Sequence, residues 1–495
     1  MIDAIFIPGA FERRMPLFNT LGKVVMIFGL SLALPIGISH YLNDGAERAY
    51  DEALLLTVLI GAILWFSTRR YRGELATRDG FLLVGLVWTV LPALATLPLL
   101  FYLPHMSFTD AYFETVSGLT ASGATVMEQV DNLPPSINVW RTQLCWMGGM
   151  GIVVLAVAIL PLLGVGGAQL FKAEIPTPMK DNRLTPRINE TAKGLWMVYF
   201  AATIACVTAY RVAGMTWLDA MMHGFSTISL GGLSPHDASF GYFDSLAIEI
   251  VCIVFMLFAS LNFATHFLVW RRRSLRAYWR DPEVGWVLGA MLGSALLIAI
   301  FLYARSFYES FGEALRYAAF NVVSVASTAG FANADFNQWP IFAPLWMLFL
   351  SSIACSSGST GGGIKMIRAL VLQRQALREF TRILHPRAEV PLKIGSGVID
   401  NKLIFAVLAF MLIYGSVMIV MTLLLAASGV DVITAFSAVI ACLNNLGPGL
   451  HQVGPDSNFS SLTDFQTWVC TVTMLLGRLE LFTLLVLFTP GFWRK

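Results

Sequence analysis

The sequence predicts an all-α polytopic membrane protein, and three observations support this fold class. The 495-residue chain is 56% hydrophobic and only 13% charged, whereas soluble domains carry about 25% charged residues. Long apolar runs recur along the chain, each able to cross about 30 Å of hydrocarbon; they cover 80–104, 246–270, 284–306, 402–428 and 464–490. Between such runs, a short turn of mostly small residues, always containing glycine, interrupts the chain four times.

Residues 1–75 are expected to form a pair of helices, because apolar segments cover 22–41 and 54–67. The start of the chain lacks the compact order of basic residues, apolar residues and cleavage site that marks a removed signal peptide. We therefore expect 22–41 to be a retained helix.

The rest of the chain divides into four similar units, 76–180, 181–280, 281–395 and 396–495. Each unit contains a long apolar helix, a short amphipathic segment, a glycine turn and a second long helix. Short segments such as "SFTDAYFETVSGL" and "VITAFSAVIACLNN" cannot cross a bilayer, so their length indicates re-entrant half-helices. The sequence thus predicts four parallel membrane–pore–membrane repeats around one pore, plus the N-terminal pair, with about ten spans in total.

Charge placement predicts that all four turns enter the membrane from the same side. The connectors between units are basic, as in the cluster Arg271, Arg272, Arg273, Arg276 and Arg280. The segments that follow the turns carry acidic residues instead, including Asp131, Asp237 and Asp456. By the positive-inside rule, the turns enter from the outer face. Asp110, Asp219 and Asp431 should lie near the N-termini of three half-helices, where an anion complements the helix dipole.

The four turns, "TASGA", "ISLGG", "STAGF" and "NNLGP", form the candidate ion site. Non-helical backbone at membrane depth survives only where protein buries it or where it lines a wet cavity. Four such turns around one axis would present a ring of carbonyl oxygens, which is how a potassium filter replaces the ion's hydration shell. Glycine permits the backbone angles that such a lining needs, and Ser and Thr hydroxyls would add neutral oxygens. The turns contain no carboxylate, which disfavours divalent ions.

The predicted K+ ligands are the four residues of each turn up to its aligned glycine: Thr120, Ala121, Ser122, Gly123, Ile228, Ser229, Leu230, Gly231, Ser327, Thr328, Ala329, Gly330, Asn444, Asn445, Leu446 and Gly447. A helix-capping glycine is the alternative interpretation for any single turn. None of the turns is the TVGYG of tetrameric potassium channels, so we expect K+ and Rb+ to be preferred over Na+ with weaker discrimination.

Several strings carry a family resemblance: "WRTQLCWMGGMGIVVLAVAILPLLGVGGAQLFKAEIP" (140–176), "GGLSPHDASFGYFDS" (231–245), "GSTGGGIKMIR" (358–368), "CLNNLGPGL" (442–450) and "LLGRLELFTLLVLF" (475–488). On these motifs the chain resembles, nearly end to end, TrkH-type potassium uptake subunits of the Trk/Ktr/HKT superfamily. The resemblance implies a bacterial inner-membrane homodimer with one pore per subunit, K+ as the transported ion and no organic cofactor. It also implies a separate cytosolic regulatory ring of TrkA-type nucleotide-binding chains.

The segment "SSIACSSGSTGGGIKMIR" (351–368) interrupts what would otherwise be one inner helix. Its density of Ser, Thr and Gly favours a flexible intramembrane loop below the turns, although a static helix break is an alternative. A phosphate-binding loop is excluded, because Gly363 is followed by Ile364 and not by Lys-Ser/Thr. The resemblance implies a gating loop here, on Gly358, Ser359, Thr360, Gly361, Gly362 and Gly363.

Arg478 is the second gate candidate, because it interrupts an apolar helix. A charge at such a position costs a few kcal/mol and must face water or a partner. Our hypothesis is that Arg478 faces the cavity below the filter and forms the closed barrier together with the loop. The alternative is that Arg478 pairs with a carboxylate or with loop carbonyls for structure alone.

Two other classes of function remain as rivals. A proton- or sodium-coupled carrier (a symporter) with inverted repeats would show opposite sidedness in its halves, and the histidines offer a poor proton relay, with His223 and His266 expected in the core. An intramembrane hydrolase would need a nucleophile with a general base, or an HExxH pair, and neither motif is found. We therefore expect a lipid-embedded transporter, not an enzyme and not a nucleic-acid-binding protein.

Overall fold

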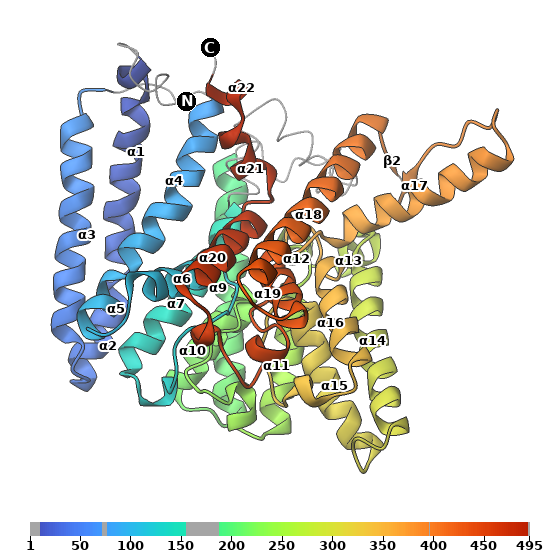
Figure 1. Cartoon of the computed structure of the whole chain (residues 1–495), viewed down its shortest axis with the longest axis horizontal. Helices are drawn as coiled ribbons and strands as arrows, with labels where there is room; N and C mark the ends of the chain where they lie inside the picture. Colours follow the sequence, from blue (N-terminus) through green and yellow to red (C-terminus); the bar gives the residue numbers. More distant parts are fainter. Residues whose placement is uncertain (1–9, 72–76, 155–187, 396, 494–495) are drawn as a thin grey trace.

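The structure is a computed structural model, and it describes residues 10–71, 77–154, 188–395 and 397–493. Within these ranges the chain is mainly helical, as predicted, and the strands β1 (Lys393–Ile394) and β2 (Gly397–Val398) form one short hairpin. The first helices are α1 (Ala10–Leu30), α2 (Ala33–Leu42) and α3 (Glu47–Thr68). Helices α1 and α3 stand side by side at one edge of the molecule (Figure 1).

Four groups of helices follow, and each contains one short half-helix. The first group is α4 (Thr77–Ala95), α5 (Leu97–Tyr102), half-helix α6 (Phe108–Leu119) and α7 (Pro135–Val154). The second is α9 (Ile188–Ala213), half-helix α10 (Trp217–Ser229), α11 (Leu246–Ala259), α12 (Phe263–Arg272) and α13 (Arg276–Arg280). The predicted boundary between 180 and 181 lies outside the described residues.

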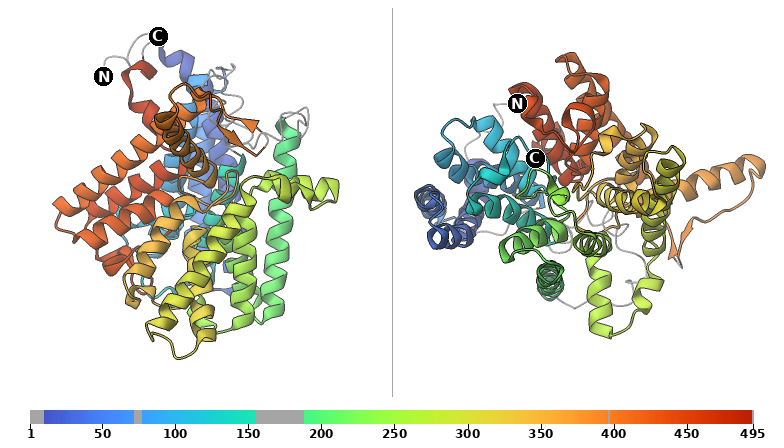
Figure 2. Two further views of the ribbon diagram at one scale, coloured as in Figure 1. Left: turned by 90° about the vertical axis from the view of Figure 1, so that its right-hand side faces the viewer. Right: turned by 90° about the horizontal axis from the view of Figure 1, so that it is seen from below.

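The third group is α14 (Val284–Ala304), half-helix α15 (Phe311–Ala326), α16 (Phe342–Ile353) and α17 (Met366–Leu384). The fourth is α18 (Asn401–Ala427), half-helix α19 (Val432–Asn444), α20 (Asp464–Arg478), α21 (Phe482–Leu485) and α22 (Pro490–Trp493). Short 3-10 turns lie at Val130–Asn132, Ser239–Tyr242, Phe336–Gln338, His451–Val453, Phe459–Ser461 and Val486–Phe488. Figure 2 (right) shows the coloured segments following one another around a common centre, while α17 and the hairpin project to one side.

Not every predicted span is a single straight helix. Six helices are long and apolar enough to cross a membrane, or up to eight if each bent pair counts as one span, within the described part of the chain. The predicted spans 246–270 and 464–490 are both broken: α11 and α12 meet at 93°, and α20 meets the following helix at 107°. Asn262 caps α12 by accepting a hydrogen bond from the Ala264 N–H, and Glu480 and Leu481 have positive φ. These local signals end the helices inside apolar runs.

The four half-helices begin in the same way. Each N-cap side chain accepts a hydrogen bond from the N–H three residues ahead, at 3.0–3.1 Å; the pairs are Ser107–Asp110, Thr216–Asp219, Ser310–Glu313 and Asp431–Thr434. Such caps satisfy the free amides at a helix start. The three aspartates therefore lie at half-helix N-termini, as predicted. Following the charge prediction, we call the end of the molecule where these helices begin the outer end.

Candidate functional site

The four half-helices also end in the same way, and this shared ending builds the candidate site. Each ending contains a residue in the left-handed region with φ between 51° and 62°: Ala121, Leu230, Thr328 and Asn445. The next residue donates its N–H to a carbonyl five positions earlier, at 2.8–2.9 Å: Ser122 to Ser117, Gly231 to Ser226, Ala329 to Ser324 and Leu446 to Ala441. A left-handed conformation is unfavourable for Leu and for β-branched Thr. Its repetition indicates that the surrounding structure enforces it.

After this residue pair, each turn has a glycine with positive φ: Gly123 (79°), Gly232 (67°), Gly330 (79°) and Gly447 (101°). The sequence prediction aligned Gly231 with the other three glycines, and this register is wrong by one residue. Gly231 takes the place of Ser122, so the second turn is Ser229 to Gly232, and Ile228 lies one residue before it. In a Gly-Gly pair the sequence does not indicate which glycine needs the positive φ.

The four glycines contact one another's turns in a closed cycle. A Cβ added to Gly123 would lie 2.6 Å from the Gly231 carbonyl oxygen, and one added to Gly232 would lie 2.0 Å from the Ala329 oxygen. From Gly330 the distance to the Leu446 oxygen would be 2.0 Å, and from Gly447 the distance to the Ser122 oxygen would be 2.8 Å. Each turn therefore lies against the main-chain carbonyl of the next, and the fourth lies against the first. We call these four turns the carbonyl ring.

Most hydroxyl groups in the ring bond to protein groups nearby. The hydroxyls of Thr120, Ser229 and Ser327 donate to carbonyls of their own half-helices. Thr328 accepts a hydrogen bond from the Gly362 N–H at 2.9 Å. Ser122 accepts one from the Asn445 amide at 2.8 Å. The main-chain carbonyls, not these hydroxyls, are the groups suited to face an ion.

A buried ion pair supports the ring on its outer side, and the sequence reasoning missed it. Arg141 in α7 donates from Nε to Glu114 Oε1 in α6 at 2.7 Å, and both side chains are buried. Glu114 also accepts the Val126 N–H at 3.1 Å, and Arg141 Nη1 donates to the Ser234 carbonyl at 3.3 Å. The pair thus ties the chain after the first turn to the chain after the second. A charged residue inside "SFTDAYFETVSGL" was the available signal.

A cavity of about 160 Å³ opens onto the outer side of the ring. Segments that follow all four turns line it; these include Gly123, Gly232, Gly330, Pro448, Asp237 and Asp456. Next to it, His236 Nδ1 lies 2.5 Å from Asp131, and its Nε2 lies 3.3 Å from Asp219. Burial disfavours the charged imidazole, but the contacts with Asp219 and Asp131 raise the pKa of His236. Carboxylates near the mouth of a cavity concentrate cations there.

The predicted gating loop lies across the inner side of the ring. Thr360 donates to the Ile228 carbonyl at 3.0 Å. A Cβ added to Gly361 would lie 3.0 Å from the Ser327 oxygen, and one added to Gly362 would lie 1.8 Å from the Asn444 oxygen. The loop thus contacts the ends of the second, third and fourth half-helices. Lys365 also donates to the Gly361 carbonyl within the loop.

Arg478 holds this loop against the first turn. Its Nη1 donates to the Thr360 carbonyl at 2.9 Å, and its Nη2 donates to the Gly148 carbonyl at 3.0 Å. Gly148 packs on the Leu119 carbonyl, where an added Cβ would lie 1.8 Å from the oxygen. Arg478 is 3% exposed, and its partners are one carbonyl of the loop, at Thr360, and one carbonyl of α7, at Gly148. Among the described residues no carboxylate forms an ion pair with it.

Glu283 fastens both ends of the loop, and the sequence reasoning did not single it out. Its carboxylate accepts hydrogen bonds from Ser356 Oγ at 2.9 Å, from the Ser357 N–H at 3.0 Å and from the Ile367 N–H at 3.0 Å. Glu283 is fully buried and directly precedes α14. The sequence signal was a pair of acids, Asp281 and Glu283, directly after a strongly basic connector.

The arrangement differs from a conventional metal centre. Within the described ranges no group of three or more His, Cys, Asp or Glu side chains is placed to hold a metal ion. The carbonyl ring offers neutral main-chain oxygens at the centre of four packed turns, a donor set that suits a dehydrated alkali cation.

Comparisons with known proteins agree with this geometry. The family model TrkH, described as a cation transport protein, matches residues 48–495. The chain is 46% identical over 480 residues to the Trk system potassium uptake protein TrkH of Halomonas elongata, covering 97% of this chain and 99% of that protein. It is 35% identical over 475 residues to TrkG of Escherichia coli, covering 96% and 97%.

A solved structure is similar over nearly the whole chain. The crystal structure of the potassium transporter TrkH from Vibrio parahaemolyticus matches with a TM-score of 0.89 and 43% identity, covering 98% of this chain and 100% of that one. The chain therefore belongs to the TrkH family of cation transport proteins, and it is a multi-pass protein of the bacterial inner membrane.

Proposed function

We propose that the chain carries potassium ions into the cell through the carbonyl ring, as a channel-like uptake protein. The observation that carries the proposal is the closed cycle in which each ring glycine abuts the carbonyl of the next turn. Neutral carbonyls held around one axis replace the hydration shell of an alkali cation. The relatives' names give potassium as the ion that those proteins take up.

The driving force is the membrane potential. At roughly 100 mV, inside negative, each cation gains about 2.3 kcal/mol on entry, equivalent to about a fifty-fold gradient. A passive pore is therefore sufficient for accumulation, and no catalytic chemistry is needed.

A proton- or sodium-coupled symporter is the alternative. Proton coupling would need a titratable relay within the membrane. His223 bonds to the Asp219 carbonyl at 2.9 Å and to Ser234 at 3.1 Å, and His266 bonds to Tyr278 at 2.7 Å and to the Phe258 carbonyl at 2.9 Å. Both histidines have protein partners on both ring nitrogens, as expected for core residues. This arrangement favours the channel over the proton carrier.

In this proposal the loop from Gly358 to Gly363 is the gate, and Arg478 holds it closed. The loop contacts three half-helix ends, and Arg478 bonds the loop to Gly148. We further propose that the chain acts as a homodimer and that a cytosolic TrkA-type nucleotide-binding partner moves the loop. The name "Trk system" of the relatives supports a system of several subunits.

Rubidium-86 flux into proteoliposomes tests the proposal. The purified chain, clamped at an inside-negative potential, should take up Rb+ with no proton or sodium gradient, and K+ should compete better than Na+. A flux that requires either gradient would establish the symporter. Repeating the measurement with and without the cytosolic partner tests the regulation separately.

A further inference from the structure

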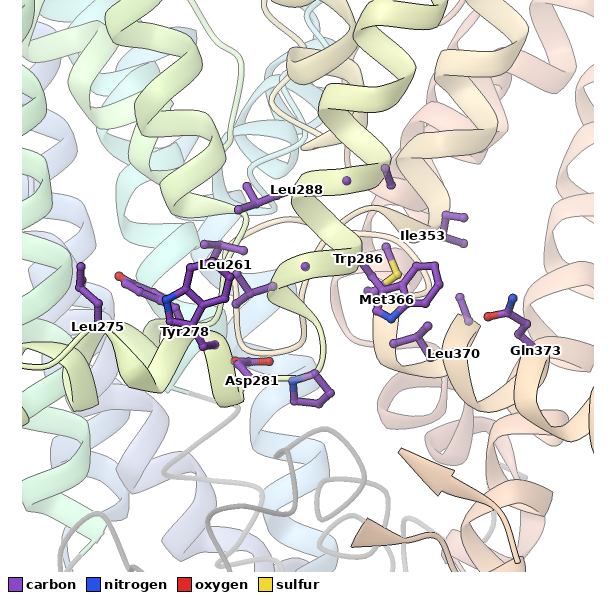
Figure 3. Close-up of a pocket in the computed structure, with 17 residues that line it drawn as sticks. Leu261, Leu275, Tyr278, Asp281, Trp286, Leu288, Ile353, Met366, Leu370 and Gln373 are labelled. Atoms are coloured by element: carbon purple, nitrogen blue, oxygen red, sulfur yellow. The ribbon is translucent and has the colours of Figure 1, made fainter. Parts of the chain in front are cut away.

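A large apolar groove lies between α13, α14 and the junction of α16 with α17 (Figure 3). Its volume is about 1380 Å³. Leu275 directly precedes α13 and Trp279 lies in it, while Trp286 and Gly289 come from α14, Ile353 from α16 and Leu370 from α17. Large apolar side chains remain open to the surroundings here, since Trp279 is 90% exposed and Leu275 is 65% exposed. Because α14 is a candidate membrane span, apolar side chains exposed beside it face the hydrocarbon of the membrane.

The groove lies at the inner end of the membrane. It surrounds the first turns of α14, the span Val284–Ala304. Immediately before this span the chain carries an arginine cluster that is exposed at Arg271, Arg272, Arg273, Arg276 and Arg280. Basic residues flank the cytosolic ends of spans, and tryptophans gather at the same interface. The groove therefore opens to the inner leaflet and to the headgroup layer together.

The face of α14 that lines the groove carries glycines in place of larger side chains. Gly285 and Gly289 lie one helical turn apart and line the groove, and a Cβ added to either would have no atom within 4 Å. The helix therefore presents main chain and empty space to the membrane at this level. An extended hydrocarbon chain fits such a surface, whereas a flat face would not retain one.

Charge complementarity selects the occupant. Basic pockets between transmembrane helices on the cytosolic side bind anionic lipid headgroups. Arg276 and Arg280 do not line the groove themselves, but they lie on α13, the short helix that supplies Tyr278 and Trp279 to it. The groove also contains one acid, Asp281, whose carboxylate already accepts hydrogen bonds from Thr265 Oγ1 at 2.7 Å and from the Glu283 N–H at 3.0 Å.

We propose that this groove binds an anionic phospholipid of the inner leaflet, with an acyl chain along the glycine face of α14 and the phosphate at the arginines of α13. The groove wall includes Ile353 and Met366, the last residue of α16 and the first of α17. These two residues flank the intramembrane loop on both sides. An effect of the lipid on flux rests on the proposed function, but the binding itself does not.

The test uses the purified full-length chain and native mass spectrometry with added phosphatidylglycerol or phosphatidylcholine. The wild-type protein should retain phosphatidylglycerol more strongly than phosphatidylcholine at equal concentration. Gly289→Trp fills the groove and should weaken retention by at least about fivefold. Gly415→Trp is the matched control, because Gly415 lies in α18, also has open space where a Cβ would be, and does not line the groove.

A second pair of changes tests the charge, including the case in which Gly289→Trp fails to fold. Arg276→Gln with Arg280→Gln should abolish the preference for phosphatidylglycerol while leaving the topology signal of Arg271, Arg272 and Arg273 intact. Equal retention of the two lipids by the wild-type protein would overturn the proposal. So would a Gly289→Trp protein that binds lipid normally but loses its dimer, because the groove would then belong to a contact between copies of the chain.

Discussion

The side-chain amide of Asn445 donates a 2.8 Å hydrogen bond to the hydroxyl of Ser122, which is 323 positions earlier in the chain. The same amide donates to the Met474 carbonyl at 3.0 Å. Asn445 is the left-handed residue of the fourth turn, and Ser122 precedes the ring glycine of the first. The bond therefore joins the two ends of the four-turn series, and with the main-chain contacts it closes the carbonyl ring.

Breaking this closing bond should loosen the ring. We expect Asn445→Ala and Ser122→Ala each to lower the free energy of unfolding by about 1–3 kcal/mol, because a buried partner group is left unsatisfied. The double variant should lose less than the sum, with a coupling of about 0.5–1.5 kcal/mol. Unfolding by SDS in detergent solution measures the stability of all four proteins: the wild type, the two single variants and the double variant. Strictly additive losses would mean that the two side chains act independently.

The register of the second turn can be tested with two adjacent glycines. Gly232→Ala would press its Cβ against the Ala329 carbonyl at 2.0 Å and force a left-handed alanine, so Rb+ uptake should fall by at least roughly tenfold. Gly231 does not need a left-handed conformation, although a Cβ added to it would lie 2.7 Å from Cys145 Cβ, so α7 would have to move slightly. Uptake by Gly231→Ala should be closer to wild type. A larger loss of uptake in Gly231→Ala than in Gly232→Ala would show instead that Gly231 is the ring glycine of the second turn.

Removing the Arg478 contacts should release the loop. Arg478→Ala deletes bonds to two carbonyls, and hydrogen bonds to charged groups contribute about 1.5–3 kcal/mol each. Partner-free Rb+ flux should therefore rise by about tenfold or more. Arg382→Ala, on the half-exposed part of α17, is the control and should leave flux unchanged. Normal flux with poor yield of folded protein would instead assign Arg478 a structural role only.

Glu283 should keep the loop inaccessible from the cytosol. Glu283→Ala leaves three buried donors without their acceptor, at a cost of about 1–3 kcal/mol for each, whereas Glu283→Gln keeps one carbonyl oxygen. Cys355 lies buried at the start of the loop with its thiol 3.2 Å from the Ser327 carbonyl. In a background that retains only this cysteine, maleimide labelling should be fastest for alanine and intermediate for glutamine. Equal labelling rates in all three proteins would show that Glu283 does not keep the loop closed to the cytosol.

The outer histidine should make stability depend on pH. Burial opposes charging of His236, but Asp219 and Asp131 raise its pKa above the ordinary 6.5. A raised histidine pKa contributes stability that is fully present below pH 6.5 and is lost as pH rises through the folded-state value. The melting temperature should therefore decline from pH 6 to pH 8. His236→Gln should flatten this decline, whereas His105→Gln, at an exposed position, should not.

The pKa of Asp131 shifts in the opposite direction, so its contribution to stability has the opposite dependence on pH. Burial opposes its charged form, but hydrogen bonds from the Asp237 N–H and from His236 lower its pKa below the ordinary 3.8. Its contribution is present above pH 3.8 and is lost as pH falls through the lowered pKa. The contact between Asp131 and His236 should thus be strongest from about pH 4 to 6.5.

The sequence alone determined the helical membrane class, the existence of four half-helices and the positions where they begin. These features depend on short-range interactions: Ser107, Thr216, Ser310 and Asp431 each accept a hydrogen bond from the N–H three residues ahead, in the first turn of the helix. Apolar run length predicted membrane insertion, but it did not reveal the bends after α11 and α20, because capping residues and positive φ values interrupt the helices without interrupting the hydrophobicity.

Tertiary structure decided everything that depends on contacts between repeats. Gly232, not Gly231, has the positive φ and lies against the Ala329 carbonyl of the third turn, where a Cβ would be only 2.0 Å from the oxygen. Arg478 bonds to Thr360 and Gly148, and Glu283 bonds to Ser356 and Ile367, across large separations in sequence. A linear sequence carries helix propensity and capping locally, whereas the partners of a buried charge are chosen only when distant helices pack together.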